Sequence, residues 1–303
     1  RRRRRALLEI ADAEGTPAYV YDLAEVERAA RALLDHAGAD RVLYAMKANP
    51  HPEILRLLAD AGLGLECVSP GELARVFSTL PDLDPDRVLF TPNFAARQEY
   101  AEALARGVRV TLDNLHPLRA WPELFEGRSL FVRVDPGRGR GHHAHVRTAG
   151  ALSKFGVAPS ELEELRARAA AAGATIVGLH AHSGSGIRTA GAWSDVGAFL
   201  AQVAEGFPDV RVLDVGGGLG VPEKPGDRPL DLEALGRALA GVRAARPGVE
   251  VWIEPGRYLV AGAGVLLARV TQTKRKGEVR FVGVDAGMNT LVRPAMYGAF
   301  HEI

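Results

Sequence analysis

Short apolar runs bounded by turn residues recur along the chain and predict a regular series of buried β-strands. The runs are rich in Val, Leu and Ile, and they lack the alternation of a strand with one solvated face, so a parallel sheet buried on both faces is favoured. We predict eight strands, at Val42–Met46, Leu63–Val68, Val88–Phe90, Val108–Leu112, Leu130–Val134, Thr175–His180, Val210–Val215 and Val251–Ile253.

Helical stretches rich in Ala, Leu, Glu and Arg lie between most of these strands. The predicted helices are Pro52–Ala61, Gly71–Ser78, Arg97–Arg106, Ser160–Ala172 and Leu232–Ala245. Repeated strand–helix units close into a parallel sheet through right-handed crossovers. Eight units make an α/β fold of the (β/α)8 TIM-barrel type, whose reacting groups lie at the carboxyl ends of the strands.

Several of the predicted strand ends carry chemically reactive residues. Lys47 follows the first barrel strand in "RVLYAMKANPHPEI", and Glu66 and Cys67 end the second. Three later strands run into "HAHSGSG", "DVGGGLG" and "EPGR". A lone lysine at a strand end is usually a solvated one. Because these ends meet on one face of a barrel, together they predict an active site.

Composition narrows the classes of function. Apolar residues make up 47% and charged residues 25% of the chain, and the formal net charge is +1, so no overall field favours nucleic acid or a membrane as partner. No apolar run has the length of a membrane span. Cys67 is the single cysteine, which excludes an internal disulfide and fits a reducing, cytoplasmic setting. Five of the 38 basic residues are Lys, a weak reason to examine Lys47.

Glycines after the seventh barrel strand predict an anion site. Gly216, Gly217 and Gly218 let backbone N–H groups converge on an anion, although a flexible turn explains the triplet equally well. The loops after the last two strands of a barrel commonly bind phosphate. A lysine and a phosphate site together suggest pyridoxal phosphate, whose aldehyde condenses with an amine and whose ring accepts electrons.

Such a ring needs a carboxylate near its pyridine nitrogen, and Glu254 at the last strand end is in a position to supply it. A rim ion pair between Glu254 and Arg257 is an equal alternative. His182 is a candidate to stack on the ring, and Ser185 to donate to the phosphate. We expect His180 to pack inside the barrel because it still lies within its strand.

Two further groups of residues are weaker candidates. Lys154 is a rival for the cofactor amine, but it follows a loop and not a strand end. His142, His143 and His145 have the composition of a metal site, but no carboxylate is placed to complete it. We therefore predict no metal.

Four motifs in a fixed order carry a family resemblance over nearly the whole chain. "YAMKANP", "HSGSG", "DVGGGLG" and "EPGR" resemble the barrel-type pyridoxal-phosphate decarboxylases of basic amino acids. "SKFGV" and the late "DAGMNTLVRPAMYGAFHEI", with its RPA-x-YGA pattern, resemble the diaminopimelate decarboxylase branch. "SPGE" and "GHHAHVRTAG" are similar to versions fused behind an aspartate kinase.

The resemblance implies a reaction and a role for each matching residue. The reaction would be decarboxylation of meso-2,6-diaminopimelate to L-lysine with release of CO2. Lys47, His182 and Glu254 would be catalytic, with Lys47 holding the cofactor aldehyde and His182 stacking on the ring. The cofactor would also be bound by Ser185, Gly216, Gly217, Gly218, Gly256 and Arg257. The distal amino-acid end of the substrate would be bound by Arg257, Arg293 and Tyr297.

The resemblance also implies a domain organisation and a homodimer with shared active sites. The barrel would span residues 22–268, and residues 1–21 and 269–303 would form part of a second β domain, which includes the strand in "TPAYVYD". In the family the chain continues beyond "YGAFHEI", so we expect this chain to be truncated. Glu66 stands where many relatives have aspartate, and we assign it no role.

Three alternatives remain open at this stage. The chain could be an ornithine- or arginine-type decarboxylase or a carrier-linked amino-acid decarboxylase, although RPAMYGA favours a substrate with a distal carboxylate. An amino-acid racemase on the same barrel is less favoured because those enzymes usually set arginine against the pyridine nitrogen. A non-catalytic relative that binds pyridoxal phosphate is the third.

Overall fold

A closed barrel of eight parallel strands forms the centre of the computed structural model, which describes residues 2–137 and 153–303. The strands follow one another in chain order, and pairing of the first with the last closes the barrel. Every predicted strand is present, so the predicted α/β barrel is confirmed. The strands are β2 (Arg41–Ala45), β3 (Gly64–Cys67), β4 (Val88–Phe90), β5 (Arg109–Leu112), β6 (Ser129–Arg133), β7 (Thr175–His180), β8 (Val212–Asp214) and β9 (Glu250–Ile253).

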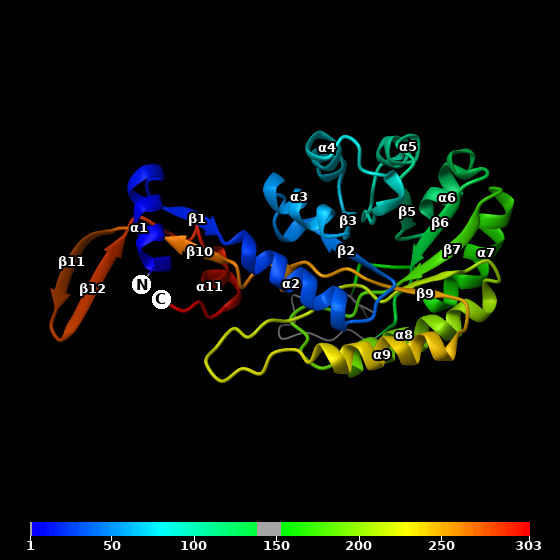
Figure 1. Ribbon diagram of the computed structural model, residues 1–303. Helices are drawn as coiled ribbons and strands as arrows, with labels where there is room; N and C mark the ends of the chain where they lie inside the picture. The colour runs from blue at the N-terminus through cyan, green and yellow to red at the C-terminus, as the bar shows by residue number, and fades with distance from the viewer. Residues whose placement is uncertain (1, 138–152) are drawn as a thin grey trace.

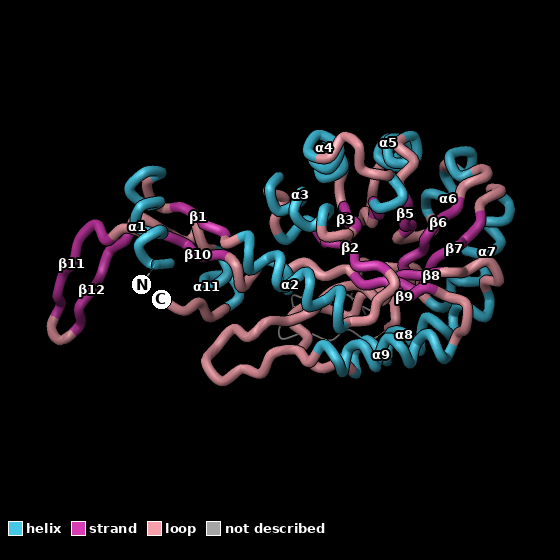
Figure 2. Tube along the Cα trace, in the orientation of Figure 1, coloured by secondary structure: helices cyan, strands magenta, loops and turns pink. Residues whose placement is uncertain are grey.

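Helices surround the barrel strands, as Figures 1 and 2 show. They are α2 (Leu23–His36), α3 (Pro52–Asp60), α4 (Pro70–Thr79), α5 (Arg97–Ala105), α6 (His116–Ala120), α7 (Leu162–Ala171), α8 (Gly191–Val203) and α9 (Leu232–Ala245). Short 3₁₀ turns are η1 (Met46–Ala48), η2 (Pro85–Arg87), η3 (Pro122–Phe125), η5 (Pro159–Glu161) and η6 (Ala204–Gly206). In the described part of the chain, no helix is long and apolar enough to cross a lipid bilayer.

Two apolar layers stabilise the barrel. The larger lies between the strands and the surrounding helices. The smaller fills the barrel interior and consists of Leu43, Leu89, Phe131, Val212 and Trp252. Gly178 makes room for Phe131, because a Cβ at residue 178 would lie 2.3 Å from the phenyl ring. The interior is thus a packed core, and ligands are left to the strand ends.

Strands outside the barrel gather at one end of the molecule (Figure 1). β1 (Ala18–Tyr21) pairs antiparallel with β10 (Gly264–Leu267), which confirms that the "TPAYVYD" strand lies outside the barrel. β11 (Val270–Lys276) and β12 (Val279–Val284) form a hairpin. The remaining helices are α1 (Arg2–Glu14), α10 (Arg257–Val260) and α11 (Val292–Tyr297). The domain boundaries themselves stay predictions, and β10 falls inside the predicted barrel range although it pairs with β1.

Candidate active site

Lys47 lies in η1, directly after β2, and is held by a buried carboxylate. Its Nζ atom is 2.6 Å from Oε2 of Glu66, which belongs to β3 and is 1% exposed. The hydroxyl of Thr91 donates to the other oxygen of Glu66. Burial lowers the pKa of Lys47, but the charges of Glu66 and Glu254 outweigh it, and the pKa is raised above its ordinary value. Without a ligand, Lys47 is therefore an ammonium.

Glu254 follows β9, the strand paired with β2, and is 6% exposed. Its Oε2 atom lies 3.2 Å from Nε2 of His180. Burial raises the pKa of a carboxyl, but His180 and the charge of Lys47 prevail here and lower the pKa of Glu254 to about 2. Glu254 is thus ionised at neutral pH, and its carboxylate also has a side-chain hydrogen bond with Asp214.

Asp214, at the end of β8, and His180, at the end of β7, both lie close to Glu254. Ligand-type atoms of these three residues lie within 4.8 Å of one another, and all three are buried. Burial and the charge of Glu254 raise the pKa of Asp214 well above its ordinary value. Asp214 therefore favours the protonated form, and the carboxyl pair carries a single negative charge. His180 lies in β7 and is buried, as expected, but it also contacts Glu254.

This trio has the composition of a metal site, and it is the one group of that kind within residues 2–137 and 153–303. Glu254 of this trio is also the residue predicted to face the pyridine nitrogen, and the expectation that no metal binds stays a prediction. The three candidate metal ligands predicted from the sequence, His142, His143 and His145, lie outside the described residues.

His182 lies in the loop after β7 with a fixed ring orientation. Its Nδ1 atom accepts a hydrogen bond of 3.2 Å from the backbone N–H of Gly217. Burial lowers the pKa of His182 to about 3, and the charges of Arg133 and Lys47 add to this. A neutral imidazole held in one orientation can pack flat against an aromatic cofactor without competing for its negative charges.

The loops after β7 and β8 are paired through their backbones. Ile187 donates its N–H to the carbonyl of Gly218 at 2.9 Å, and Gly220 donates to the carbonyl of Ile187 at 2.8 Å. The N–H of Gly216 donates to the Asp214 carboxyl at 2.9 Å. The serine–glycine loop and the glycine triplet therefore form one rigid edge of the site.

The triplet has no room for side chains. A Cβ at Gly217 would lie 2.0 Å from the carbonyl oxygen of Glu254, and one at Gly218 would lie 2.2 Å from that of Gly184. Gly216 and Gly218 also have φ angles of 71° and 86°, which L side chains rarely adopt. Gly256 is similarly close to the turn that carries Lys47, because a Cβ at residue 256 would lie 3.0 Å from the carbonyl oxygen of Ala45.

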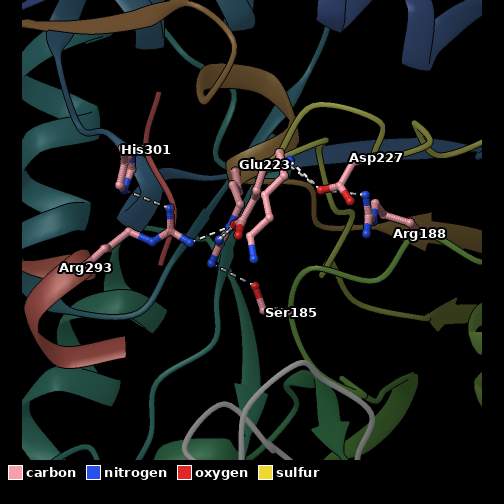
Figure 3. Close-up of polar contacts among 8 residues, drawn as sticks. Ser185, Arg188, Glu223, Asp227, Arg293 and His301 are labelled. Carbon is pink, nitrogen blue, oxygen red and sulfur yellow. Dashed lines mark hydrogen bonds and ion pairs between the residues drawn. The ribbon is translucent and has the colours of Figure 1, made fainter. Parts of the chain in front are cut away.

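Two arginines share one carboxylate next to the serine–glycine loop, and Figure 3 shows Arg293, Glu223 and Ser185 in this network. Arg257 donates to Oγ of Ser185 at 3.2 Å and to Oε1 of Glu223 at 3.1 Å. Arg293 donates to the same Glu223 oxygen at 2.8 Å and lies 3.3 Å from Nε2 of His301. In the described part of the chain, the ion-pair partner of Arg257 is thus Glu223 and not Glu254. The alternative of a rim pair between Glu254 and Arg257 is not what the structure shows.

The remaining sequence candidates are Tyr297 and Lys154. Tyr297 belongs to α11, like Arg293, and its side chain is 39% exposed. Lys154 is exposed, with its Nζ atom 5.0 Å from the centre of the Phe155 ring, and it does not stand at a strand end. The geometry therefore favours Lys47 as the reactive amine.

Residues 23–261 match the family described as pyridoxal-dependent decarboxylase, pyridoxal binding domain. The chain belongs to this family. It is 38% identical to the diaminopimelate decarboxylase of Methanothermobacter thermautotrophicus, over 98% of this chain and 72% of that protein. It is also 38% identical to the diaminopimelate decarboxylase of Deinococcus radiodurans, over 99% of this chain and 76% of that protein.

Solved structures of diaminopimelate decarboxylases agree with this assignment. The Helicobacter pylori enzyme, complexed with L-lysine, superposes with a TM-score of 0.89 at 28% identity. The match covers 98% of this chain and 77% of that one. The enzyme from M. jannaschii, also in complex with L-lysine, gives a TM-score of 0.86 at 26% identity, over 98% of this chain and 73% of that one.

The residues present fit the cofactor of a pyridoxal-dependent decarboxylase. Lys47 supplies an amine at a strand end. The ionised carboxylate of Glu254, at the end of the strand next to that of Lys47, has the charge that a protonated pyridine nitrogen requires. The N–H groups of Gly216 and Gly217 are bonded to Asp214 and His182, so an anion site at the glycine triplet stays a prediction.

Sequence reasoning missed two charged residues of the site, Glu66 and Glu223. Glu66 was findable, because it ends the strand next to that of Lys47, and neighbouring parallel strands end at the same edge. Nothing in the sequence around Glu223 indicates a role in the site, because this residue does not lie at a strand end. It lies in an irregular loop, and its two partners are 34 and 70 residues away in the chain.

Proposed function

We propose that this chain catalyses the pyridoxal-phosphate-dependent decarboxylation of meso-2,6-diaminopimelate to L-lysine and CO2. The observation that carries the proposal is the pairing of an amine and an ionised carboxylate on neighbouring strands, Lys47 after β2 and Glu254 after β9, beside the glycine triplet. The relatives at 38% identity named diaminopimelate decarboxylase support the choice of substrate.

On the cofactor side, each residue has a separate task. Bound pyridoxal phosphate withdraws electrons from the bond that links Cα to the leaving carboxylate. Lys47 holds the cofactor through its amine, and Glu254 keeps a proton on the pyridine nitrogen. Neutral His182 packs against the ring. Ser185, Gly218 and Gly256 would contact the phosphate, while Gly216 and Gly217, whose N–H groups bond Asp214 and His182, would shape the backbone around it.

On the substrate side, Arg257, Arg293 and Tyr297 bind the distal amino-acid end. A guanidinium fork suits a carboxylate because it donates two parallel hydrogen bonds. The relatives solved with L-lysine support a site of this kind, since lysine retains that distal carboxylate.

We also propose that the chain works as a homodimer with shared active sites, in the cytoplasm. Apolar side chains exposed on the segment after the barrel, among them Phe281 and Met288, support an interface there. The single cysteine, buried and unpaired, is consistent with a reducing compartment. The division into a barrel at 22–268 and a second domain at 1–21 and 269–303 belongs to the same proposal.

The cofactor is tested by adding pyridoxal phosphate, recording the absorbance of the bound form, and reducing the complex with borohydride. Peptide mapping is expected to find the label on Lys47. A Lys154→Ala variant is the matched control and should be labelled like the unaltered chain. Label on Lys154, or no label at all, would contradict the proposal.

The substrate is tested by measuring CO2 release from meso-diaminopimelate, L-ornithine and L-arginine with the same cofactor-loaded protein. Release from diaminopimelate alone is expected. Preference for ornithine or arginine would favour the alternative decarboxylases. Cofactor binding without release from any substrate would favour a non-catalytic relative.

A further inference from the structure

One carboxylate oxygen stands between the two arginines proposed to bind substrate. Oε1 of Glu223 accepts from Arg257 at 3.1 Å and from Arg293 at 2.8 Å, and the three side chains are each about one-third exposed, at 34–35%. A carboxylate between two guanidinium groups is the arrangement expected for a bound substrate carboxylate. Glu223 thus occupies the place where the distal carboxylate would bind.

The loop that carries Glu223 is braced by its own contacts (Figure 3). The carboxyl oxygen Oδ2 of Asp227 accepts from the backbone N–H groups of Glu223 and Lys224, at 2.9 and 3.1 Å. The same Asp227 oxygen lies 3.0 Å from Nη1 of Arg188, close to the paired loops of the site. Because the backbone at residue 223 is fixed, its side chain can leave the arginines without rearrangement of the loop.

Electrostatics explains why an anion is needed between the arginines. Burial and the neighbouring charge of Arg293 lower the pKa of Arg257, and Glu223 opposes the effect. Removal of Glu223 without replacement would leave two like charges facing each other. A substrate carboxylate can take over this role, whereas a ligand that ends in an ammonium alone cannot.

We propose that Glu223 is a specificity-determining residue that exchanges places with the distal carboxylate of the substrate and then pairs with the distal ammonium. The ammonium and carboxylate of an amino acid share one carbon, so a carboxylate displaced from the arginines lies within reach of that ammonium. The pair of arginines and Glu223 would thereby recognise a complete amino-acid end. This inference rests on the proposed function, because it takes the arginines as the distal subsite.

Three ligands that differ by single groups separate the contributions of the carboxylate and of the α-ammonium to binding. L-Lysine carries both the carboxylate and the α-ammonium, 6-aminohexanoate lacks the α-ammonium, and cadaverine lacks the carboxylate. Their dissociation constants are measured by calorimetry on the full chain loaded with cofactor, for the unaltered protein and for Glu223→Gln. The unaltered protein should bind L-lysine about fivefold more tightly than 6-aminohexanoate, as a partly exposed charged contact allows.

In Glu223→Gln this preference should disappear, while 6-aminohexanoate should bind at least as tightly as before, because its competitor for the arginines is gone. Cadaverine should bind no better to the variant. Glu233→Gln, at an exposed site on α9, is the control and should keep the preference. Thermal unfolding of both variants checks that they fold.

Two outcomes would overturn the assignment, and they can be told apart. If Glu223→Gln weakens or tightens L-lysine and 6-aminohexanoate equally, Glu223 only positions or masks the arginines, and the proposed function stands. If the unaltered, cofactor-loaded protein binds none of the amine ligands, the proposed function fails and the role of Glu223 fails with it.

Discussion

The carboxylate of Glu66 holds Lys47 in place and also favours the ammonium form of Lys47, which cannot react with an aldehyde. An amine must be neutral to attack an aldehyde, but Glu66 and Glu254 raise the pKa of Lys47 and favour the ammonium. Glu66 therefore positions Lys47, but it lowers the fraction of neutral amine that can react with the cofactor. In the absence of cofactor, it holds the amine at the mouth of the barrel.

Substitution Glu66→Gln should shift cofactor capture to lower pH. Loss of the carboxylate removes an interaction that raises the pKa of Lys47, so the neutral amine becomes available at lower pH. The measurement is the rate of pyridoxal phosphate binding from pH 6 to 10, followed by absorbance. Glu53→Gln, in an exposed pair with Arg56, should leave the profile unchanged. An unshifted profile for Glu66→Gln would contradict the role of Glu66.

The depressed pKa of His182 should be visible in the way the free energy of unfolding depends on pH. Its pKa is about 3 in the folded chain against an ordinary 6.5, so between these values only the unfolded chain carries a proton on residue 182. The free energy of unfolding therefore rises with pH through this window, by about 1.4 kcal/mol per pH unit from this one group. In His182→Asn, which keeps an acceptor for Gly217, that contribution to the slope should vanish.

Denaturant titrations of the cofactor-free protein at several pH values measure this slope. Above pH 7 the two proteins should show the same slope, which serves as the internal control. Equal slopes below pH 6.5 as well would show that His182 is protonated in the folded chain.

At the scale of single residues, the sequence predicts which residues lie at a strand end more reliably than which side chains contact each other. The placement of Lys47 and Glu254 followed from the barrel alone. The partner of Arg257 did not, because Glu254 and Glu223 are both plausible acids until the fold shows which one is near. Glu66 could have been paired with Lys47 from the order of the strands.

Among the elements, the paired loops after β7 and β8 depend on glycine. Gly217→Ala should destabilise the protein by about 1–3 kcal/mol, because its Cβ would lie 2.0 Å from a backbone oxygen that cannot turn away. Gly241→Ala is a matched control in the open face of α9, where nothing lies within 4 Å, and it should stabilise by about 0.5–1 kcal/mol.

Chemical unfolding of both variants measures these free energies. The Gly217→Ala variant should also bind pyridoxal phosphate more weakly, while Gly241→Ala should bind it normally. A Gly217→Ala variant as stable as the unaltered chain would mean that the loops adapt, and that the triplet is a flexible turn.

The barrel strands could be predicted because most are apolar runs bounded by turn residues, but α2, α6 and α8 were not predicted. α6 and α8 lack a side-chain cap at their start. The predicted helix Leu232–Ala245 matches α9 in full, since the side chain of Asp231 caps it. β11 could not be found in this way. Its sequence, VTQTKRK, is polar and every residue is exposed, so its pairing with β12 depends on the hairpin and not on burial.

At the scale of the whole molecule, apolar side chains remain exposed after the barrel. They include Val270, Val279, Phe281, Val282, Val284, Met288 and Met296. A two-stranded sheet is marginally stable in water, so further polypeptide is expected to cover this surface. The relatives are longer than the part that matches this chain, so the rest of such a β domain and a second subunit are both candidates to cover it.

If active sites are shared between subunits, specific activity of the cofactor-loaded protein should fall on dilution as the dimer dissociates. Sedimentation at the same concentrations gives the fraction of dimer, and the two curves should coincide. A protein that stays monomeric and keeps a constant activity per chain would contradict the shared site.

The ladder between β1 and β10 has a consequence for synthesis on the ribosome. In the sheets that the structure describes, residues 18–21 have one neighbouring strand, and it is formed by residues 264–267. β1 therefore stays unpaired during synthesis until residues 264–267 have emerged, after the barrel strands. Translation speed and chaperone binding during that interval are therefore expected to influence the yield of this protein.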